Sequence, residues 1–202
     1  YGEKTGLIPD RKWKSKTKQE PWYPGETLNV GIGQGYFLAT PMQLTLATST
    51  LSNDGNTFIP HLLLSYKDNK TKELTMYDPD NNKFYTQMKN QDYLEIVKNA
   101  MWRVVNEKRV GTASHMKKVG DIEYAGKTGT AQVYNLDKGK TGTKNLQDHA
   151  LFISYAPFDK PEVVVTVIVE HGGGGSSTAA PIARDIIEYY MENKTQKVAV
   201  NE

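Results

Sequence analysis

The stretch Lys127–Val133, which reads KTGTAQV, is the most informative part of the chain. Its composition predicts a short strand, in which alternate residues point to the same side. Lys127 and Gly129 should therefore share one face, and Thr128 and Thr130 the other. Because Gly129 has no side chain, a ligand or a neighbouring segment can approach the backbone closely there. Such an edge could hold an anionic acyl compound and offer N–H groups to a developing oxyanion.

The residues after this strand predict a hairpin. A polar loop, Tyr134–Asp148, leads to an apolar strand over His149–Ala156. Residues Pro157–Pro161 suit a hairpin turn, and Val163–Val169 should form the return strand. Only Thr166 interrupts the valine and isoleucine run of that strand, so both of its faces should be buried.

A helix should close the chain. The glycines of Gly172–Gly175 end the last strand, and apolar residues then recur at helical spacing over about Thr178–Met191. The side chains expected to face inward are Ile182, Ile186, Ile187 and Tyr190. Residues 193–202 are expected to form a frayed tail, so that 1–192 makes up the folded part.

The N-terminal region predicts little regular structure before its first helix. Residues 1–35 are rich in glycine and proline and predict an irregular, packed loop. The basic run within them, 11–18, is expected to be a solvated surface loop rather than a polyanion site. A helix should begin at Pro41, with Thr40 as N-cap and Gln43 completing a capping box, and end at residues 53–55.

The middle of the chain predicts strands, turns and a second helix. A strand is expected over Phe58–Tyr66, a polar turn over Asp68–Lys72, a return strand over Leu74–Tyr77 and another turn over Asp78–Asn82. The helix should run from about residue 91 to residue 106. The side chains expected on its buried face are Leu94, Val97, Met101 and Val104.

These elements together predict an α+β fold, in which helices flank an antiparallel sheet of about three core strands. A strand buried on both faces indicates more strands and helices than this chain supplies. The chain also begins at Tyr1 rather than at a methionine, so we expect it to be a piece of a longer protein.

Composition and charge exclude several function classes. The net charge of +2 over 202 residues is too small to indicate a nucleic-acid partner. The absence of cysteine excludes disulfides and thiolate metal sites. His61, His115, His149 and His171 lack the spacing of metal ligands, and no cofactor is expected. No run reaches the ~18 apolar residues of a membrane helix, and no signal peptide is recognisable.

Three glycine-containing motifs have alternative interpretations that their context disfavours. Gly126–Thr128 lacks the spacing of a P-loop, because Asp121 stands where a glycine is needed, and a strand rather than a helix follows. Gly31–Gly35 misses the dinucleotide-loop spacing and predicts a backbone turn before the next helix. His171–Gly174 is similar to the oxyanion loop of lipases, but the chain has no Gly-x-Ser-x-Gly elbow, so a strand exit is favoured.

Seven stretches, which cover nearly the whole chain, occur in the order typical of one family. They are Gly6–Pro9, Pro21–Gly25, Val30–Tyr36, Ala39–Gln43, Pro60–Leu63, Gly111–Ala113 and Gly126–Val133. With these motifs the chain resembles the C-terminal part of the transpeptidase domain of class B penicillin-binding proteins. Within that class it looks most like the elongation-type enzymes of Gram-negative bacteria.

The resemblance implies a serine acyl-transfer enzyme. Such enzymes use three motifs, Ser-x-x-Lys, Ser-x-Asn or a variant, and Lys-Thr-Gly, of which only the third is matched here. The resemblance places the first two upstream of Tyr1. Ser114–Lys117 fits the letters of the first motif, but it lies just before the third, which is the wrong place for the nucleophile. The chain alone is therefore expected to be inactive.

The resemblance also implies roles for four residues. Lys127 supplies positive charge beside the substrate carboxylate and the general-base network. The hydroxyls of Thr128 and Thr130 bind that carboxylate, and the backbone N–H of Thr130 forms half of the oxyanion hole. Gly129 keeps the approach to the backbone open, because any Cβ there would intrude on the substrate.

For the intact protein, the resemblance implies a peptidoglycan D,D-transpeptidase that cross-links D-Ala-D-Ala stem peptides during cell-wall elongation and is a target of β-lactams. Its implied partners are the upstream half of the same protein and a SEDS-family glycosyltransferase. Its implied location is the periplasmic face of the inner membrane, held by an N-terminal helix outside this chain. Two alternatives remain open: a non-catalytic penicillin-recognising sensor or scaffold module, and a β-lactamase, against which the Pro21–Gly25 region counts.

Overall fold

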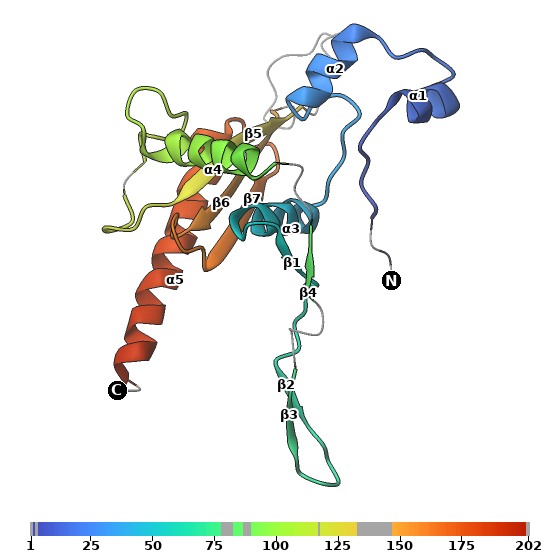
Figure 1. Ribbon diagram of the computed structural model, residues 1–202. Coiled ribbons are helices and arrows are strands. Elements are labelled where there is room, and N and C mark those ends of the chain that lie inside the picture. The colour runs from blue at the N-terminus through green and yellow to red at the C-terminus, as the bar shows by residue number, and fades with distance from the viewer. Residues whose placement is uncertain are drawn as a thin grey trace.

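A computed structural model of the chain describes residues 2, 4–77, 83–86, 90–116, 118–132 and 147–200. A three-stranded antiparallel sheet, in the order β5–β6–β7, lies at its centre (Figure 1). These strands span Ala125–Ala131, His149–Ala156 and Val163–Val169. The predicted α+β class and the bounds of both hairpin strands are confirmed. Most of the predicted loop over 134–148 lies outside the described residues.

The register of the sheet fixes how its strands present their side chains. Ala156 pairs with Val163 across the β6–β7 turn, as the predicted hairpin requires. Within the described part of the chain, β5 has only β6 beside it and therefore lies at an edge of the sheet. The lysine-threonine-glycine motif is thus carried on a strand that, among the described residues, pairs on one side only.

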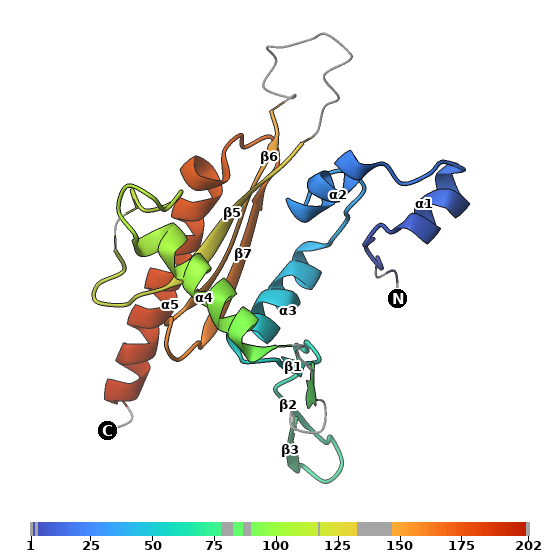
Figure 2. The ribbon, with the colours of Figure 1, turned by 45° about the horizontal axis from the view of Figure 1, so that its top comes forward.

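One face of the sheet is covered by the C-terminal helix. A short π-helix, η4 (Gly175–Ala179), leads directly into α5 (Ala180–Val200), which lies along the sheet (Figure 2). Among the described side chains of this helix, Ala180, Ala183 and Ile187 are buried and pack with Phe152 of β6. Ile182, Ile186 and Tyr190 are exposed, so their predicted inward orientation is wrong. Small residues at 180 and 183 let the helix backbone approach the sheet closely, which places the bulkier side chains outside.

Helix α5 is longer than its sequence pattern indicates. It was expected to end near Met191 but continues to Val200, so the expected tail begins inside the helix. Among the helices of the described residues, none is long and apolar enough to cross a membrane.

The opposite face is covered by α3 (Pro41–Ser52) and α4 (Gln91–Asn106). The capping box of α3 is confirmed: the Thr40 N–H donates to Gln43 Oε1 over 2.9 Å, and the Gln43 N–H donates to Thr40 Oγ1 over 3.1 Å. The Thr45 hydroxyl donates to that of Thr166 in β7, 2.8 Å away. That bond ties α3 to the middle of β7, a strand whose opposite face is covered by α5.

Helix α4 has its predicted bounds but a slightly different buried face. Leu94, Met101 and Val105 are buried, and Val104 is partly buried. Val97 is 42% exposed, so its predicted burial is wrong. The buried positions lie seven and then four residues apart, a spacing that keeps them on one stripe of the helix and leaves position 97 at its margin.

The region 1–35 contains two helices, which corrects the predicted irregular loop. Helix α1 (Arg11–Lys18) is capped by Asp10, whose carboxylate accepts from the Trp13 N–H over 2.6 Å. Helix α2 (Pro24–Gly31) begins with proline at its first position. Asp10 and Pro24 are ordinary helix-start signals. The many glycines and prolines around them obscured both starts in the sequence.

The basic run is a helix rather than a solvated loop, and one of its cations is buried. Lys14 is 1% exposed, and its Nζ lies 2.6 Å from Glu26 Oε1 and 3.4 Å from Glu20 Oε2. Its ammonium also lies 4.2 Å from the centre of the Tyr23 ring. The bond from Lys14, followed by that from the Tyr23 N–H, lowers the pKa of Glu26. Lys14 therefore joins α1 to α2.

Two short antiparallel ribbons project from the body near α3. One pairs β1 (Asn56–Phe58) with β4 (Lys83–Tyr85), and the other pairs β2 (Ser65–Lys67) with β3 (Leu74–Met76). The predicted single strand over 58–66 is wrong, because 59–64 has no regular structure. The turn after β2 and the return strand are confirmed, β4 was not predicted, and the turn predicted over 78–82 lies outside the described residues.

Candidate functional site

The edge strand β5 presents the candidate residues in the predicted alternation. Lys127 lies opposite Ile153 and Gly129 opposite Leu151, whereas Thr128 lies opposite Phe152. Directly paired residues of an antiparallel sheet project to the same face. Because Ile153 packs on the α4 side and Phe152 on the α5 side, Lys127 and Gly129 share the face toward α4.

Gly129 is approached closely by the π-helix. A Cβ on Gly175 would lie 2.5 Å from the Gly129 carbonyl oxygen and closer still to that of Leu151. Gly175 thus supports the backbone of β5 at the functional motif. A Cβ on Gly129 itself would lie 3.2 Å from Leu151 Cβ, so this position is tight even without a substrate. The predicted clash of such a Cβ with a substrate stays a prediction.

The backbone of Thr130 faces away from the sheet. Its carbonyl oxygen accepts a 2.6 Å hydrogen bond from Gln34 Nε2, which belongs to the turn after α2. In an antiparallel strand the N–H and C=O of one residue point to the same side, and successive residues alternate. The Thr130 N–H therefore also points out of the open edge of β5, where it is free of the β6 ladder. That is the orientation a backbone oxyanion donor needs.

Thr128 is held by a second segment that sequence reasoning did not assign to the site. Its Oγ1 shares a 3.1 Å hydrogen bond with Thr112 Oγ1. Thr112 sits in the turn after α4, where a Cβ on Gly111 would collide with the Arg103 and Val104 carbonyl groups. That tight turn places Thr112 against β5. The only sequence signal for it was the Gly-Thr-Ala tripeptide.

Lys127 is exposed, and its ammonium donates a 2.6 Å hydrogen bond to the carbonyl oxygen of its neighbour Thr128. The outward direction of that carbonyl agrees with the outward direction of the Thr130 carbonyl two residues on. The ammonium and two outward-facing carbonyl groups therefore lie along one open edge. The ammonium has three N–H donors, so its bond to Thr128 leaves two for a bound anion.

The sequence alternatives find no support in this geometry. Lys127 lies within a strand, not at the start of a P-loop helix. Ser114 lies in a turn, where its hydroxyl donates to Gly111 O over 2.8 Å, and Lys117 lies outside the described residues. His171 follows β7, and its N–H donates to His149 Nδ1 over 2.9 Å. No group of three or more potential metal ligands occurs in the described ranges.

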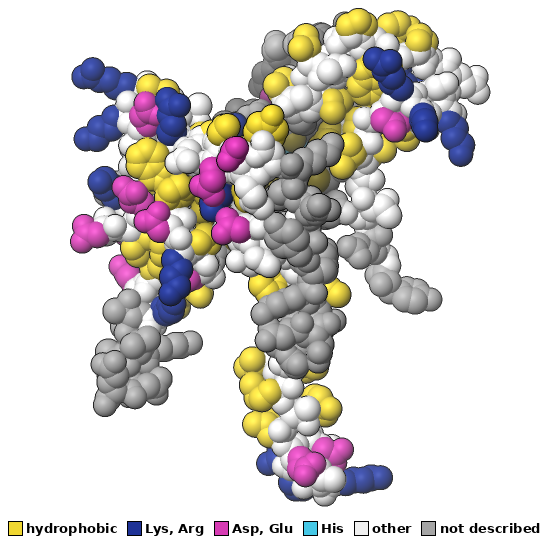
Figure 3. Space-filling model, viewed as in Figure 1, with side chains coloured by type: hydrophobic (Ala, Val, Ile, Leu, Met, Phe, Trp, Pro, Cys, Tyr) yellow, Lys and Arg dark blue, Asp and Glu magenta, His cyan; other side chains and the backbone are white. Residues whose placement is uncertain are grey.

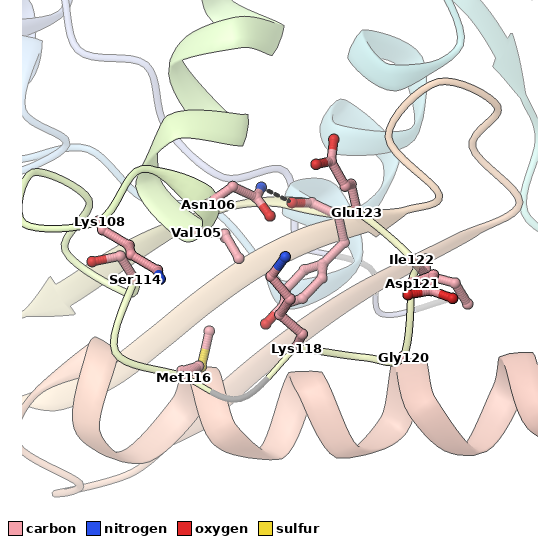
Figure 4. A pocket seen from close by; sticks show the side chains of 11 residues that line it. Val105, Asn106, Lys108, Ser114, Met116, Lys118, Gly120, Asp121, Ile122 and Glu123 are labelled. Atoms are coloured by element: carbon pink, nitrogen blue, oxygen red, sulfur yellow. Dashed lines mark hydrogen bonds between the residues drawn. The ribbon is translucent and has the colours of Figure 1, made fainter.

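A cavity of about 160 Å³ lies apart from the motif, between the end of α4 and the start of β5 (Figure 4). Asn106 and Tyr124 are among its lining residues, and Asn106 Nδ2 donates to Tyr124 O over 2.9 Å. Burial raises the pKa of Tyr124 to about 12. None of the residues 127–130 lines the cavity, so it is not the candidate site.

Known proteins match the chain over almost its whole length. Residues 1–188 match the penicillin binding protein transpeptidase domain. The peptidoglycan D,D-transpeptidase MrdA of Haemophilus influenzae is 41% identical over 97% of this chain and 30% of that protein. MrdA of Escherichia coli K12 is 35% identical over 98% of this chain and 32% of that protein. The chain thus spans about a third of the length of these curated relatives.

Solved structures agree in fold. Pseudomonas aeruginosa penicillin-binding protein 2 (PBP2), in complex with WCK 5153, matches with a TM-score of 0.73 and 38% identity, over 94% of this chain and 39% of that one. Helicobacter pylori PBP2, in complex with MreC, matches with a TM-score of 0.71 and 32% identity, over 98% of this chain and 32% of that one. The resemblance to elongation-type enzymes is confirmed by these relatives. The chain belongs to the penicillin-binding protein transpeptidase domain family.

Proposed function

We propose that this chain is the C-terminal part of a serine-type peptidoglycan D,D-transpeptidase, which cross-links stem peptides during cell-wall elongation and is acylated by β-lactams. The observation that carries the proposal is the outward-facing backbone of Thr130 on an edge strand, next to an exposed ammonium. Two relatives that match nearly the whole chain are named as D,D-transpeptidases.

In the proposed reaction a serine hydroxyl attacks the carbonyl carbon of the D-Ala-D-Ala peptide bond. The hydroxyl proton passes to a base, and the carbonyl oxygen becomes an oxyanion that the Thr130 N–H stabilises. Collapse of this intermediate breaks the C–N bond, and the leaving amine of D-Ala takes up the proton. The ester that remains is then attacked by the amine of a second stem peptide, which forms the cross-link and frees the serine.

The proposed roles of this chain are binding and polarisation. Lys127 supplies positive charge to the substrate carboxylate and the general-base network. The hydroxyls of Thr128 and Thr130 donate hydrogen bonds to the same carboxylate, while Gly129 keeps the backbone accessible. The serine and its lysine belong to a part of the protein outside these 202 residues.

The relatives also support a proposed setting for the intact protein. Enzymes that build the cell wall act on its substrate outside the cytoplasm, so we place the intact protein at the periplasmic face of the inner membrane, held by a helix outside this chain. The peptidoglycan stem peptide, β-lactams and the rest of the same protein are its proposed partners. A SEDS-family glycosyltransferase is a further proposed partner, as is an MreC-like protein, because the Helicobacter relative is described in complex with MreC.

The test is covalent labelling with a fluorescent penicillin. The full-length protein should form a stoichiometric adduct, and the 202-residue chain none. Lys127→Ala in the full-length protein should reduce labelling at least about tenfold, because the charge beside the reacting groups is lost. Lys118→Ala, which removes an exposed lysine before β5, is the matched control and should label normally. Absence of an adduct on the full-length protein would contradict the proposal and favour a non-catalytic penicillin-recognising module.

A further inference from the structure

We propose that Gln34 is a positioning residue for the oxyanion hole, acting through the backbone of Thr130. This inference rests on the proposed function. The observation behind it is the 2.6 Å bond from Gln34 Nε2 to Thr130 O, which joins residues 96 positions apart in the sequence. No substrate contact is assigned to Gln34.

The turn that carries Gln34 is held by backbone hydrogen bonds. The N–H of Gln34 donates to Asn29 O over 2.8 Å, and that of Gly33 donates to Val30 O over 3.0 Å, so the turn is anchored on the end of α2. Gly33 and Gly35 on either side have φ angles of +74° and +75°, which residues other than glycine rarely adopt. Gln34 is itself half-buried. Its amide is therefore presented from a turn that is hydrogen-bonded to the end of α2.

The strand that receives the bond needs such support. Thr130 lies near the end of β5, one residue before the strand stops, and no strand among the described residues lies beside its open side. Rotation of the Gly129–Thr130–Ala131 backbone would redirect the Thr130 N–H. The C=O of Thr130 belongs to the peptide group after its Cα, and the N–H belongs to the peptide group before it. A bond that holds the carbonyl therefore restrains rotation between the two groups and, through it, the direction of the N–H.

The bond also leaves the N–H available. Gln34 donates to the carbonyl and places no acceptor on the N–H in the described geometry, so the N–H can still serve an oxyanion. Gly175 restrains the same segment through the Gly129 carbonyl. Gly175 thus packs against the peptide group that carries the proposed donor, and Gln34 holds the next peptide group along β5.

The test uses the full-length protein with Gln34→Met, which keeps the length of the side chain and removes the N–H donor. Acylation by a chromogenic β-lactam should show a rate constant about tenfold lower, with the dissociation constant of the initial complex within about twofold of wild type, because misplacing a donor is less costly than removing one. Gln34→Glu, whose carboxylate is also unable to donate, should likewise lower the rate constant and leave the dissociation constant nearly unchanged. Gln19→Met, the same chemical change at an exposed position after α1, is the matched control.

A second readout separates positioning from general loss of structure. The infrared stretch of the acyl-enzyme ester carbonyl falls as the oxyanion-hole bonds strengthen, so Gln34→Met should shift it upward while Gln19→Met leaves it unchanged. An unshifted stretch, or an unchanged acylation rate constant in folded Gln34 variants, overturns this inference alone. A wild-type protein that is never acylated overturns the proposed function instead.

Discussion

At the scale of single residues, Thr130 has two proposed functions that substitutions can separate. Its backbone N–H is the oxyanion donor, and its hydroxyl binds the substrate carboxylate. Its N–H points out of the sheet, so proline at this position removes the proposed oxyanion donor without removing a ladder hydrogen bond. Thr130→Pro in the full-length protein should lower the acylation rate about 10²–10³-fold, with only a small fall in melting temperature. Stopped-flow acylation and thermal unfolding measure the two effects.

Two variants control this experiment. Thr130→Ala keeps the N–H and loses only the hydroxyl, so it should weaken initial β-lactam binding more than it slows acylation. Gly129→Pro removes an N–H that faces β6, and should destabilise the sheet itself. If Thr130→Pro acylated at the wild-type rate, the backbone of Thr130 could not be the oxyanion donor.

Tyr124 makes stability depend on alkaline pH. It is buried, and its hydroxyl has no hydrogen-bond partner among the described residues. Burial raises its pKa to about 12, above an unfolded value near 10. The folded state therefore binds the Tyr124 proton more tightly than the unfolded state does. The resulting stabilisation is complete below pH 10 and is lost as the pH rises toward 12.

Tyr124→Phe tests this dependence. Between pH 9 and pH 12 the free energy of unfolding of the wild type should fall more than that of the variant, by about 2 kcal/mol. Near neutral pH the variant should be as stable as the wild type, because an unpartnered hydroxyl contributes little. Parallel pH profiles for the two proteins would show that the pKa of Tyr124 is the same in the folded and unfolded states.

At the scale of elements, the π-helix is the most sensitive support of the site. Gly175→Ala places a Cβ 2.5 Å from the Gly129 carbonyl, so either η4 or β5 must move. The expected destabilisation is about 1–3 kcal/mol, with slower acylation in the full-length protein. Gly25→Ala in α2 has open space around its new Cβ and should be neutral or slightly stabilising. Equal stability of the two variants in urea unfolding would refute the support by Gly175.

The elements differ in how well their sequences predict them, for physical reasons. The capping box of α3 and the hairpin of β6 and β7 were predicted because residues close in sequence determine them. The inward face of α5 was predicted wrongly, because small residues are needed where the helix backbone lies close to the sheet. The motif strand and its alternation were predictable. Gln34 and Thr112 were not, because their contacts with β5 depend on tertiary packing between distant segments.

At the scale of the whole molecule, much apolar surface is exposed. Figure 3 shows hydrophobic side chains along the arm formed by α1 and α2 and along the β2–β3 ribbon, whose tip is charged. The exposed residues include Ile8, Leu28, Ile32 and Leu38 in the first region, and Leu62, Leu64, Tyr66, Leu74 and Met76 in the second. Patches of this kind usually mark surfaces that another part of the structure covers.

The isolated chain should therefore associate. Light scattering of the 202-residue chain should give a mass above that of a monomer, or thermal unfolding should be broad, because apolar surface left uncovered drives association. Leu28→Ser together with Ile32→Ser should reduce the association, and Lys16→Ser at an exposed position of α1 serves as control. A monodisperse monomer with a sharp unfolding transition would contradict this expectation.

The bond between Gln34 and Thr130 also has a consequence for biosynthesis. Gln34 has emerged from the ribosome by the time Thr130 is added to the chain. However, β6, which pairs with the strand of Thr130, and Gly175, which packs against that strand, are translated later. Contacts between such distant segments form late, since the chain between them must first be ordered. The motif strand thus reaches its working alignment only after synthesis of almost the entire chain, and a nascent protein on the ribosome should be unable to react with penicillin.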